Sequence, residues 1–235
     1  MGQPPSDNVG KPKAAIVDQL SSFQENQDFV TETTRELEGY GFKVDLYQGD
    51  EITVDFYRRL PTHGYKFIIF RAHSGLLGED EEVYYKTTLF TNEPYSTVKY
   101  VGEQLDDRLV IASVGEGNPM VFGIPPKFIS KSMQGKFDDT VVIMMGCSGI
   151  SLIDLAEAFV EKGASVYLAW HGSVELSYVD GATPYLIGQL CSGNLTIEEA
   201  VDNTMNIIGP DPKHKAVLKY YPLHNGNETL EELIK

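Results

Sequence analysis

Two residues of this sequence combine a reactive side chain with a setting that favours nucleophilic chemistry. Cys147 directly follows the apolar run TVVIMMG, and His73 follows the apolar run YKFIIF after two intervening residues. A glycine comes two residues after each of them. Small neighbours expose a thiol, and the amides at the start of a following helix stabilise a thiolate and a developing oxyanion. Because a histidine at a neighbouring strand end can act as a general base or as the cation of an ion pair, the two residues predict a thiol-based active site.

Both residues also have purely structural interpretations. Cysteine is among the most frequently buried residue types, and a histidine after a strand often serves only the local hydrogen bonding. His171, which follows the run SVYLAW and precedes a glycine, is a second candidate for the base, or for a pocket wall beside Trp170. His63 comes before its strand and is predicted to lie in a turn, while Cys191 follows a predicted helix and is expected to be a core or surface thiol.

No motif in the sequence indicates a metal or a nucleotide. The five histidines and two cysteines show no C-x-x-C or H-x-x-x-H spacing, which is the spacing typical of metal sites. Neither a G-x-G-x-x-G motif nor a P-loop is present, and these motifs place phosphates at helix starts. We therefore predict no metal site and no nucleotide cofactor.

Short apolar runs alternate with segments of helical periodicity along the chain. The predicted strands are 14–17, 42–47, 65–71, 140–145, 165–170 and 216–221, and the predicted helices are 29–37, 53–60, 152–160, 175–190, 197–208 and 228–235. Strands that are buried on both faces and separated by helices predict an α/β fold with a mostly parallel, doubly wound sheet. Ligands of such sheets bind past the carboxyl ends of the strands, where His73 and Cys147 are expected.

The chain is predicted to form one domain with an arm and an insertion. Residues 1–13 hold three prolines and two glycines and are expected to be a flexible arm, and 14–235 are expected to be the single domain. Residues 83–114 are rich in Val, Tyr and Thr and predict inserted β-hairpins. Ser151 with Asp154 and Thr196 with Glu199 have the spacing of helix starts.

Composition excludes several classes of function. The 235 residues carry a net charge of −15, which repels nucleic acid and anionic lipid. No apolar stretch approaches the roughly 20 residues that span a bilayer, and two cysteines cannot form a disulfide framework. The sequence as given carries no secretion signal. We expect a cytoplasmic protein, or an extracytoplasmic one if a signal or anchor has been removed.

The same strand-end residues resemble those of the caspase-like cysteine peptidases. This clan includes caspases, gingipains, clostripain, legumains and the CHAT domains. The segment TVVIMMGCSGISLIDLAEAFVEKGASVYLAWHGSV (140–174) is most similar to gingipain-type and CHAT members, and NLTIEEA (194–200) resembles a helix start common among them. The resemblance covers roughly residues 14–221. It implies a three-layer caspase-like sandwich with helices on both faces of the sheet.

The resemblance also implies roles for individual residues. His73 would be the general base and Cys147 the nucleophile, and the oxyanion hole would use the amide of Cys147 with that of Ser74 or Gly75. Ser74 stands where the family usually has a glycine directly after the histidine, which leaves open which amide points at the oxyanion. The family needs no metal or organic cofactor, although Ca²⁺ dependence occurs among relatives. The implied partner is a peptide or protein substrate.

Substrate preference is less well indicated. Relatives that cleave after basic residues often carry an acid two residues before the nucleophile, where this chain has Met145. Asp18, after the first predicted strand, could supply a carboxylate to the same cleft, or could instead bond a loop. The acidic run 79–82 (EDEE) could attract cationic substrates or Ca²⁺, or be a solvated loop. Trp170 and His171 would line the pocket. The overall negative charge of the chain favours a basic or neutral peptide over an acidic one, so we expect Arg or Lys rather than Asp at the cleaved position.

Three functions therefore remain open from the sequence. The first is a cysteine endopeptidase that acts through His73 and Cys147. The second is a binding or scaffold module of the same fold without activity, for which Ser74 and Met145 are the motivating departures. The third is another thiol enzyme, such as an amidase or acyltransferase, because a fold and a dyad do not determine the substrate.

Overall fold

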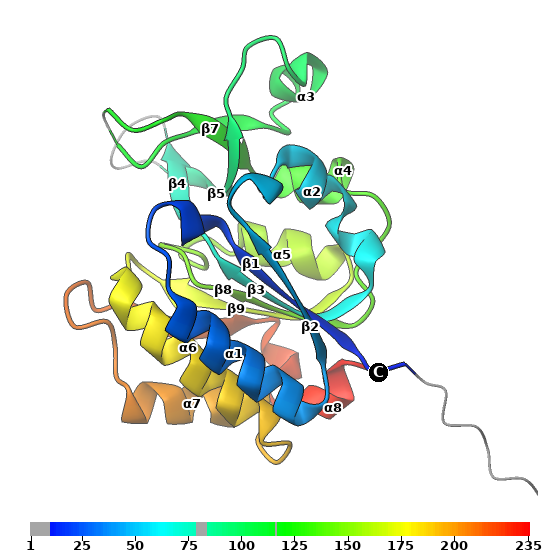
Figure 1. Cartoon of the computed structure of the whole chain (residues 1–235), viewed down its shortest axis with the longest axis vertical. Helices are drawn as coiled ribbons and strands as arrows, with labels where there is room; N and C mark the ends of the chain where they lie inside the picture. Colours follow the sequence, from blue (N-terminus) through cyan, green and yellow to red (C-terminus); the bar gives the residue numbers. More distant parts are fainter. Residues whose placement is uncertain (1–9, 79–83, 116) are drawn as a thin grey trace, which may run out of the picture.

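A computed structural model describes residues 10–78, 84–115 and 117–235. Its centre is a six-stranded sheet in the order β10-β9-β8-β3-β1-β2 (Figure 1). The strands are β1 (Lys13–Asp18), β2 (Lys43–Gln48), β3 (Tyr65–Arg71), β8 (Thr140–Met144), β9 (Ala164–His171) and β10 (Val217–Tyr221). Five of them run parallel, and β10 pairs antiparallel with β9 at one edge. The α/β fold with a mostly parallel sheet is confirmed, and each strand of the predicted main pattern ends within one residue of its expected position.

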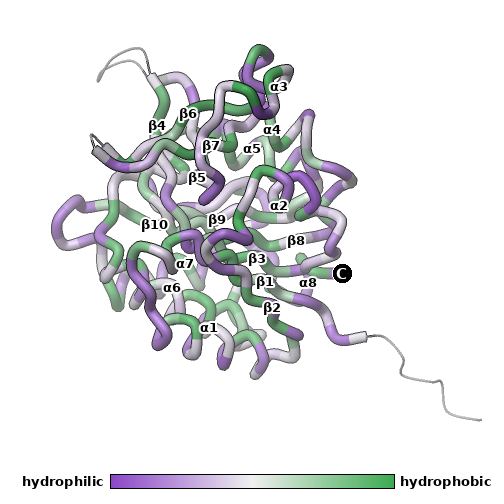
Figure 2. The backbone as a smooth tube through the Cα atoms, turned by 45° about the horizontal axis from the view of Figure 1, so that its top comes forward, coloured by the Kyte–Doolittle hydropathy of each residue, from purple (hydrophilic) through white to green (hydrophobic). Residues whose placement is uncertain are grey.

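Helices cover both faces of this sheet. One face carries α1 (Gln27–Tyr40), α6 (Leu176–Cys191), α7 (Ile197–Ile207) and α8 (Leu230–Leu233), and the other carries α2 (Val54–Arg59), α4 (Pro126–Lys131) and α5 (Asp154–Glu161) (Figure 1). The two layers enclose separate hydrophobic clusters, which meet opposite faces of the same strands. Figure 2 shows the hydrophobic stretches running along the central strands, with hydrophilic stretches in the outer loops and helix turns. Burial on both faces accounts for the continuous apolar strands.

A second, antiparallel sheet stands over the carboxyl ends of the central strands (Figure 1). Its order is β4-β5-β7-β6, with β4 (Ser74–Gly78), β5 (Tyr84–Pro94), β6 (Val110–Ala112) and β7 (Val121–Ile124), and α3 (Val101–Leu105) lies between β5 and β6. The predicted β-rich insertion over 83–114 is therefore present but larger, and it contains a helix. The strand β4 has the sequence SGLLG, whose glycines and lack of alternation hide its strand character from pattern analysis.

Side-chain caps mark the start of α1, α2, α7 and α8. Thr196 and Glu199 form the predicted capping box of α7, and the Asn26 side chain accepts the Phe29 amide at the start of α1. The expected start at Ser151 is wrong, because α5 begins at Asp154. The Ser151 hydroxyl instead accepts the Gly172 amide at 3.0 Å and so joins the loops after β8 and β9.

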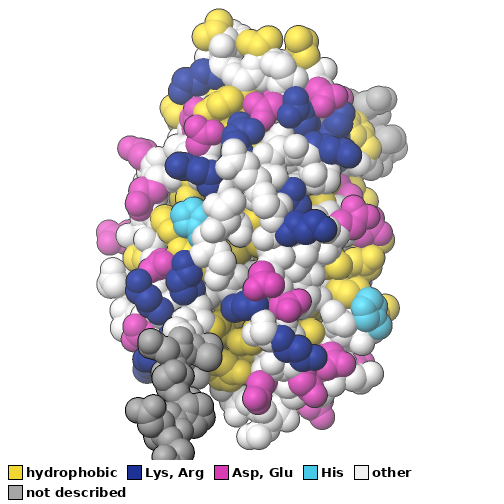
Figure 3. Space-filling model, turned by 90° about the vertical axis from the view of Figure 1, so that its right-hand side faces the viewer, with side chains coloured by type: hydrophobic (Ala, Val, Ile, Leu, Met, Phe, Trp, Pro, Cys, Tyr) yellow, Lys and Arg dark blue, Asp and Glu magenta, His cyan; other side chains and the backbone are white. Residues whose placement is uncertain are grey.

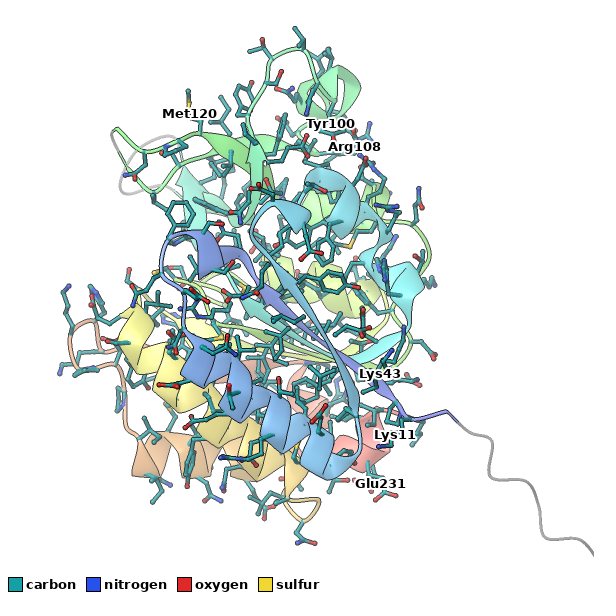
Figure 4. The ribbon with its side chains drawn as sticks, viewed as in Figure 1. Lys11, Lys43, Tyr100, Arg108, Met120 and Glu231 are labelled. Carbon is teal, nitrogen blue, oxygen red and sulfur yellow. The ribbon has the colours of Figure 1, made fainter. Side chains whose placement is uncertain are left out.

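The outer surface mixes charges of both signs. On the face drawn in Figure 3, Lys and Arg side chains alternate with Asp and Glu, and hydrophobic side chains gather at the top of the molecule, over the insertion. Figure 4 places Tyr100, Arg108 and Met120 in this upper part, whereas Lys11, Lys43 and Glu231 lie at the opposite end of the sheet. In the part of the chain that the structure describes, no helix is both long and apolar enough to cross a membrane.

Candidate active site

The loops that carry His73 and Cys147 lie side by side. The strands β3 and β8 are parallel neighbours, with Phe70 opposite Met144, so both chains leave the sheet at the same edge. The first hydrogen bond past this pairing runs from the Met145 amide to the Phe70 carbonyl at 3.0 Å. Beyond it, the Ser74 hydroxyl donates to the Cys147 carbonyl at 2.6 Å. The predicted meeting of the two segments is thus present in the tertiary structure.

Gly146 allows the two loops to approach this closely. A Cβ atom at this position would lie 2.5 Å from the Ala72 carbonyl oxygen and 2.5 Å from the Met144 Cε, and would also collide with the Ser74 hydroxyl. Real Cβ contacts of this length essentially do not occur. The residue before the cysteine must therefore be a glycine for this packing to exist.

The Cys147 thiol is half-buried and lies against the loop after β9. Its sulfur accepts the Val174 amide at 3.5 Å and donates to the Val174 carbonyl at 3.8 Å. The next residue, Ser148, has a φ of 55°, a conformation that non-glycine residues adopt at sharp turns. Its amide donates to the Gly172 carbonyl at 2.7 Å. The turn after β8 is therefore held by the turn after β9.

His73 is held at its backbone and packed at its ring. Its amide donates to the Gln19 side-chain oxygen at 2.9 Å, and its carbonyl accepts the Phe90 amide at 3.1 Å. The ring centroid lies 5.9 Å from that of Phe23 and 5.8 Å from that of Phe90. Burial between these aromatic rings lowers the pKa of His73 below its ordinary value. Burial therefore favours the neutral imidazole, which is the form that a general base requires.

The ring and the thiol do not share a hydrogen bond in this conformation. Within residues 10–78, 84–115 and 117–235, both hydrogen bonds of the Cys147 sulfur go to Val174, and no hydrogen bond of the His73 ring reaches it. The two loops are nevertheless in contact through the Ser74 hydroxyl and the Cys147 carbonyl. Catalytic hydrogen bonds commonly tighten only when substrate binds.

The pairing of β4 with β5 distinguishes the two amides predicted for the oxyanion hole. The Phe90 amide donates to the His73 carbonyl, and along the same ladder Ser74 lies opposite Leu89 and Gly75 opposite Thr88. Hydrogen-bonded and non-bonded pairs alternate in an antiparallel ladder. The Gly75 amide is therefore committed to β5, and the Ser74 amide points away from it. Of the two, the Ser74 amide is the one available to an oxyanion alongside the amide of Cys147.

A pair of polar side chains that sequence reasoning missed fixes the His73 loop. Gln19 follows β1 and is 1% exposed, and its side-chain nitrogen donates to the Asn92 oxygen at 2.6 Å. The Asn92 nitrogen in turn donates to the carbonyls of Gln19 at 3.0 Å and Gly49 at 2.9 Å. The place of Gln19, second among the polar residues that follow a buried strand, could have marked it as a candidate in the sequence. No sequence pattern marked Asn92, because its strand belongs to the insertion.

Asp18 does not offer a free carboxylate to this site. It is completely buried and receives the Arg71 guanidinium at 2.8 Å. The same guanidinium donates to both oxygens of Asp180 on α6, at 2.8 and 2.9 Å, and to the Gln24 carbonyl at 3.0 Å. Burial opposes the charge of Arg71, while the hydrogen bonds and attraction of the two carboxylates outweigh it and raise its pKa. Asp18 thus neutralises an internal cation and supplies nothing to a pocket for a basic side chain.

The other predicted pocket residues differ in exposure. Met145 and Trp170 are buried in the hydrophobic cluster shared with α1 and α6, with exposures of 1% and 0%. His171 is exposed at the end of β9, where it pairs with Val217 of β10. The acidic run 79–82 lies outside the described residues. Within those residues, no group of three His, Cys, Asp or Glu side chains could hold a metal ion.

Comparison with known proteins identifies no family for this chain. No family model matches the chain, and none of the curated proteins does. Among solved structures, a flavodoxin of Streptococcus pneumonia TIGR4 is similar at 10% identity and a TM-score of 0.30, over 72% of this chain and 92% of the flavodoxin. At that level the similarity carries no argument about fold or function.

Proposed function

We propose that this protein is a cysteine peptidase of the caspase-like type, in which His73 is the general base and Cys147 the nucleophile. The observation that carries the proposal is the contact between the two strand-end loops, through the Ser74–Cys147 hydrogen bond and the close approach at Gly146. The central sheet order β2-β1-β3-β8-β9-β10 with helices on both faces supports the three-layer sandwich implied by the sequence resemblance. In open α/β sheets the crevice past the carboxyl ends is the usual ligand site.

The reaction follows from the chemistry of the residues present. The neutral His73 ring takes the proton of the Cys147 thiol as the sulfur attacks the carbonyl carbon of the scissile peptide bond. The resulting oxyanion accepts hydrogen bonds from the amides of Cys147 and Ser74, which carry partial positive charge without needing to reorganise. The histidinium then donates its proton to the leaving amine, and water, deprotonated by the same ring, hydrolyses the thioester.

The proposal includes no preference for basic residues at the cleaved position. Such a preference was expected on the basis of Asp18, whose charge is matched by Arg71 in the interior. Met145 stands at the position where relatives carry an acid, and its side chain lies in the core. The alternatives of an inactive scaffold and of another thiol enzyme are separated from the peptidase by the experiment below.

The test is covalent labelling with peptidyl acyloxymethyl ketones that carry Arg, Lys, Asp or Leu at the cleaved position. We expect wild type to be modified once, on Cys147, faster than a small free thiol, and Cys147→Ala to be unmodified. Cys191→Ala is the matched control, because burial raises the pKa of the Cys191 thiol to about 12 and keeps it protonated. This variant is expected to label like wild type.

The outcomes separate the three functions. Labelling of wild type no faster than that of a free thiol contradicts any enzyme that acts through Cys147 and favours the inactive scaffold. Fast labelling of Cys147 without hydrolysis of any member of a quenched peptide library favours an amidase or acyltransferase. A His73→Asn variant should label markedly more slowly than wild type if the ring is the base.

A further inference from the structure

A small apolar pocket adjoins His73 on the outer face of the second sheet. It has a volume of about 140 Å³, and the residues that border it belong to β4, β5 and β6 or directly follow β6: Gly75, Leu76, Leu77, Thr88, Phe90, Ile111, Ala112 and Ser113. Along β5, Thr88 and Phe90 face this pocket, whereas Leu89 between them is fully buried in the core. The pocket is thus separated from the hydrophobic core by the thickness of the sheet.

Two features of the backbone create the hollow. Gly75 has no side chain to fill the space above it, and a Cβ atom there would meet no heavy atom within 4 Å. Ala112, which is 5% exposed, contributes only a methyl group on the same face. Phe90 closes the end toward the active site, and its ring centroid lies 5.8 Å from that of His73. The pocket is therefore immediately next to the imidazole.

The position of the pocket relative to His73 and Cys147 indicates which segment of a bound peptide would lie next to it. In the proposed reaction His73 must give a proton to the leaving amine, so the peptide segment after the scissile bond passes the imidazole. The Cys147 thiol, in contrast, is hydrogen-bonded to Val174 in the loop after β9. The acyl segment of the substrate therefore belongs on the β9 side, and the amine segment on the side of Phe90.

We propose that this pocket binds one apolar side chain of the substrate, that of the first or second residue after the scissile bond. The inference rests on the proposed peptidase function and names a part of its specificity. A cavity of about 150 Å³ lined by Leu, Ile and Phe accommodates benzene, so the volume here matches a single Leu, Ile or Phe side chain. A charged side chain would lose its hydration against this lining and is rejected.

The experiment measures cleavage of quenched peptides that differ only after the scissile bond. The residue before the scissile bond is the one that gives the fastest ketone labelling. Each of the two positions after the scissile bond is varied among Leu, Phe, Ala, Asp and Lys. We expect kcat/KM for Leu or Phe to exceed that for Asp by at least about tenfold, the usual discrimination of an apolar pocket. Equal rates for Leu and Asp at both positions would overturn the assignment.

Two variants test the pocket itself. Ile111 is 48% exposed at the rim, so Ile111→Lys should fold normally, lower the Leu-to-Asp ratio toward one and raise cleavage of the Asp peptide. Val114, 43% exposed and outside the lining, provides the matched Val114→Lys control. If both variants shift the ratio equally, the change reflects general charge and the pocket assignment fails. Gly75→Leu, which fills the hollow, should abolish the preference.

The labelling reagents separate this inference from the proposed function. In a peptidyl acyloxymethyl ketone only the acyloxy leaving group occupies the region after the scissile bond, and a small acetoxy group is used so that no apolar side chain enters the pocket. Ile111→Lys should therefore label at the wild-type rate. Loss of labelling in wild type would refute the peptidase, whereas normal labelling without any preference after the bond would refute only the pocket.

Discussion

Substitution of Gly146 by alanine tests whether the close approach of the two loops creates the site. The added Cβ would lie 2.5 Å from the Ala72 carbonyl oxygen, about 0.9 Å short of ordinary van der Waals contact. That carbonyl is backbone of the loop after β3, so the strand ends themselves must separate. Overpacking of this kind costs about 1–3 kcal/mol of unfolding free energy. A displacement of about 1 Å at reacting groups lowers rates about 100-fold.

The assay combines urea unfolding with labelling. Trp170 is the only tryptophan of the chain and is completely buried on β9, so its fluorescence reports unfolding. We expect Gly146→Ala to lower the unfolding free energy and to slow ketone labelling of Cys147. The matched control is Gly39→Ala in α1, where an added Cβ meets nothing within 4 Å. That change should raise stability by about 0.5–1 kcal/mol and leave labelling unchanged.

A companion variant locates the clash. In Ser74→Ala/Gly146→Ala the hydroxyl contact is removed but the Ala72 carbonyl contact remains, so only part of the stability should return. If Gly146→Ala unfolds and labels like wild type, the two loops are not in the contact described, and the reasoning that links the strand ends to reactivity is wrong.

Three further predictions concern charges. Arg71→Met should cost about 3–5 kcal/mol in urea unfolding because Asp18 and Asp180 are left buried without a cation; adding Asp18→Asn and Asp180→Asn should recover part of the loss, and no recovery would argue against a charge effect. Burial lowers the pKa of His73 in the folded protein, so on acidification the unfolded chain binds a proton at His73 before the folded protein does, and the unfolding free energy should fall as pH drops below about 6.5. The difference in urea midpoint between wild type and His73→Asn should show this fall, and the rate of ketone labelling should stay constant to a pH below 6.5. Asp154 accepts hydrogen bonds from the Thr87 amide and hydroxyl at 2.8 Å each, so Asp154→Ala should lower the unfolding free energy by about 1.5–3 kcal/mol. An unchanged urea midpoint would argue that these bonds do not hold the second sheet to α5.

The sequence by itself determined the main sheet and the two candidate residues. Apolar runs of a few residues separated by helical periodicity indicate a doubly wound sheet because each strand must be buried on both faces. The rule that ligands lie past the carboxyl ends then selected His73 and Cys147 without knowledge of any contact. The capping box at Thr196 was likewise readable, because its two side chains are three residues apart in the chain.

What only the tertiary structure decided are the interactions between residues far apart in sequence. The position of Asp18 after a strand suggested a binding carboxylate, but its partner Arg71 lies 53 residues away along the chain. The second carboxylate on Arg71, Asp180, lies a further 109 residues along the chain. The extent of the second sheet, the Gln19–Asn92 support of the His73 loop and the pocket beside Phe90 depend on pairings that local patterns do not encode. A carboxylate takes its role from the charge that packs against it, and that packing is set by the fold.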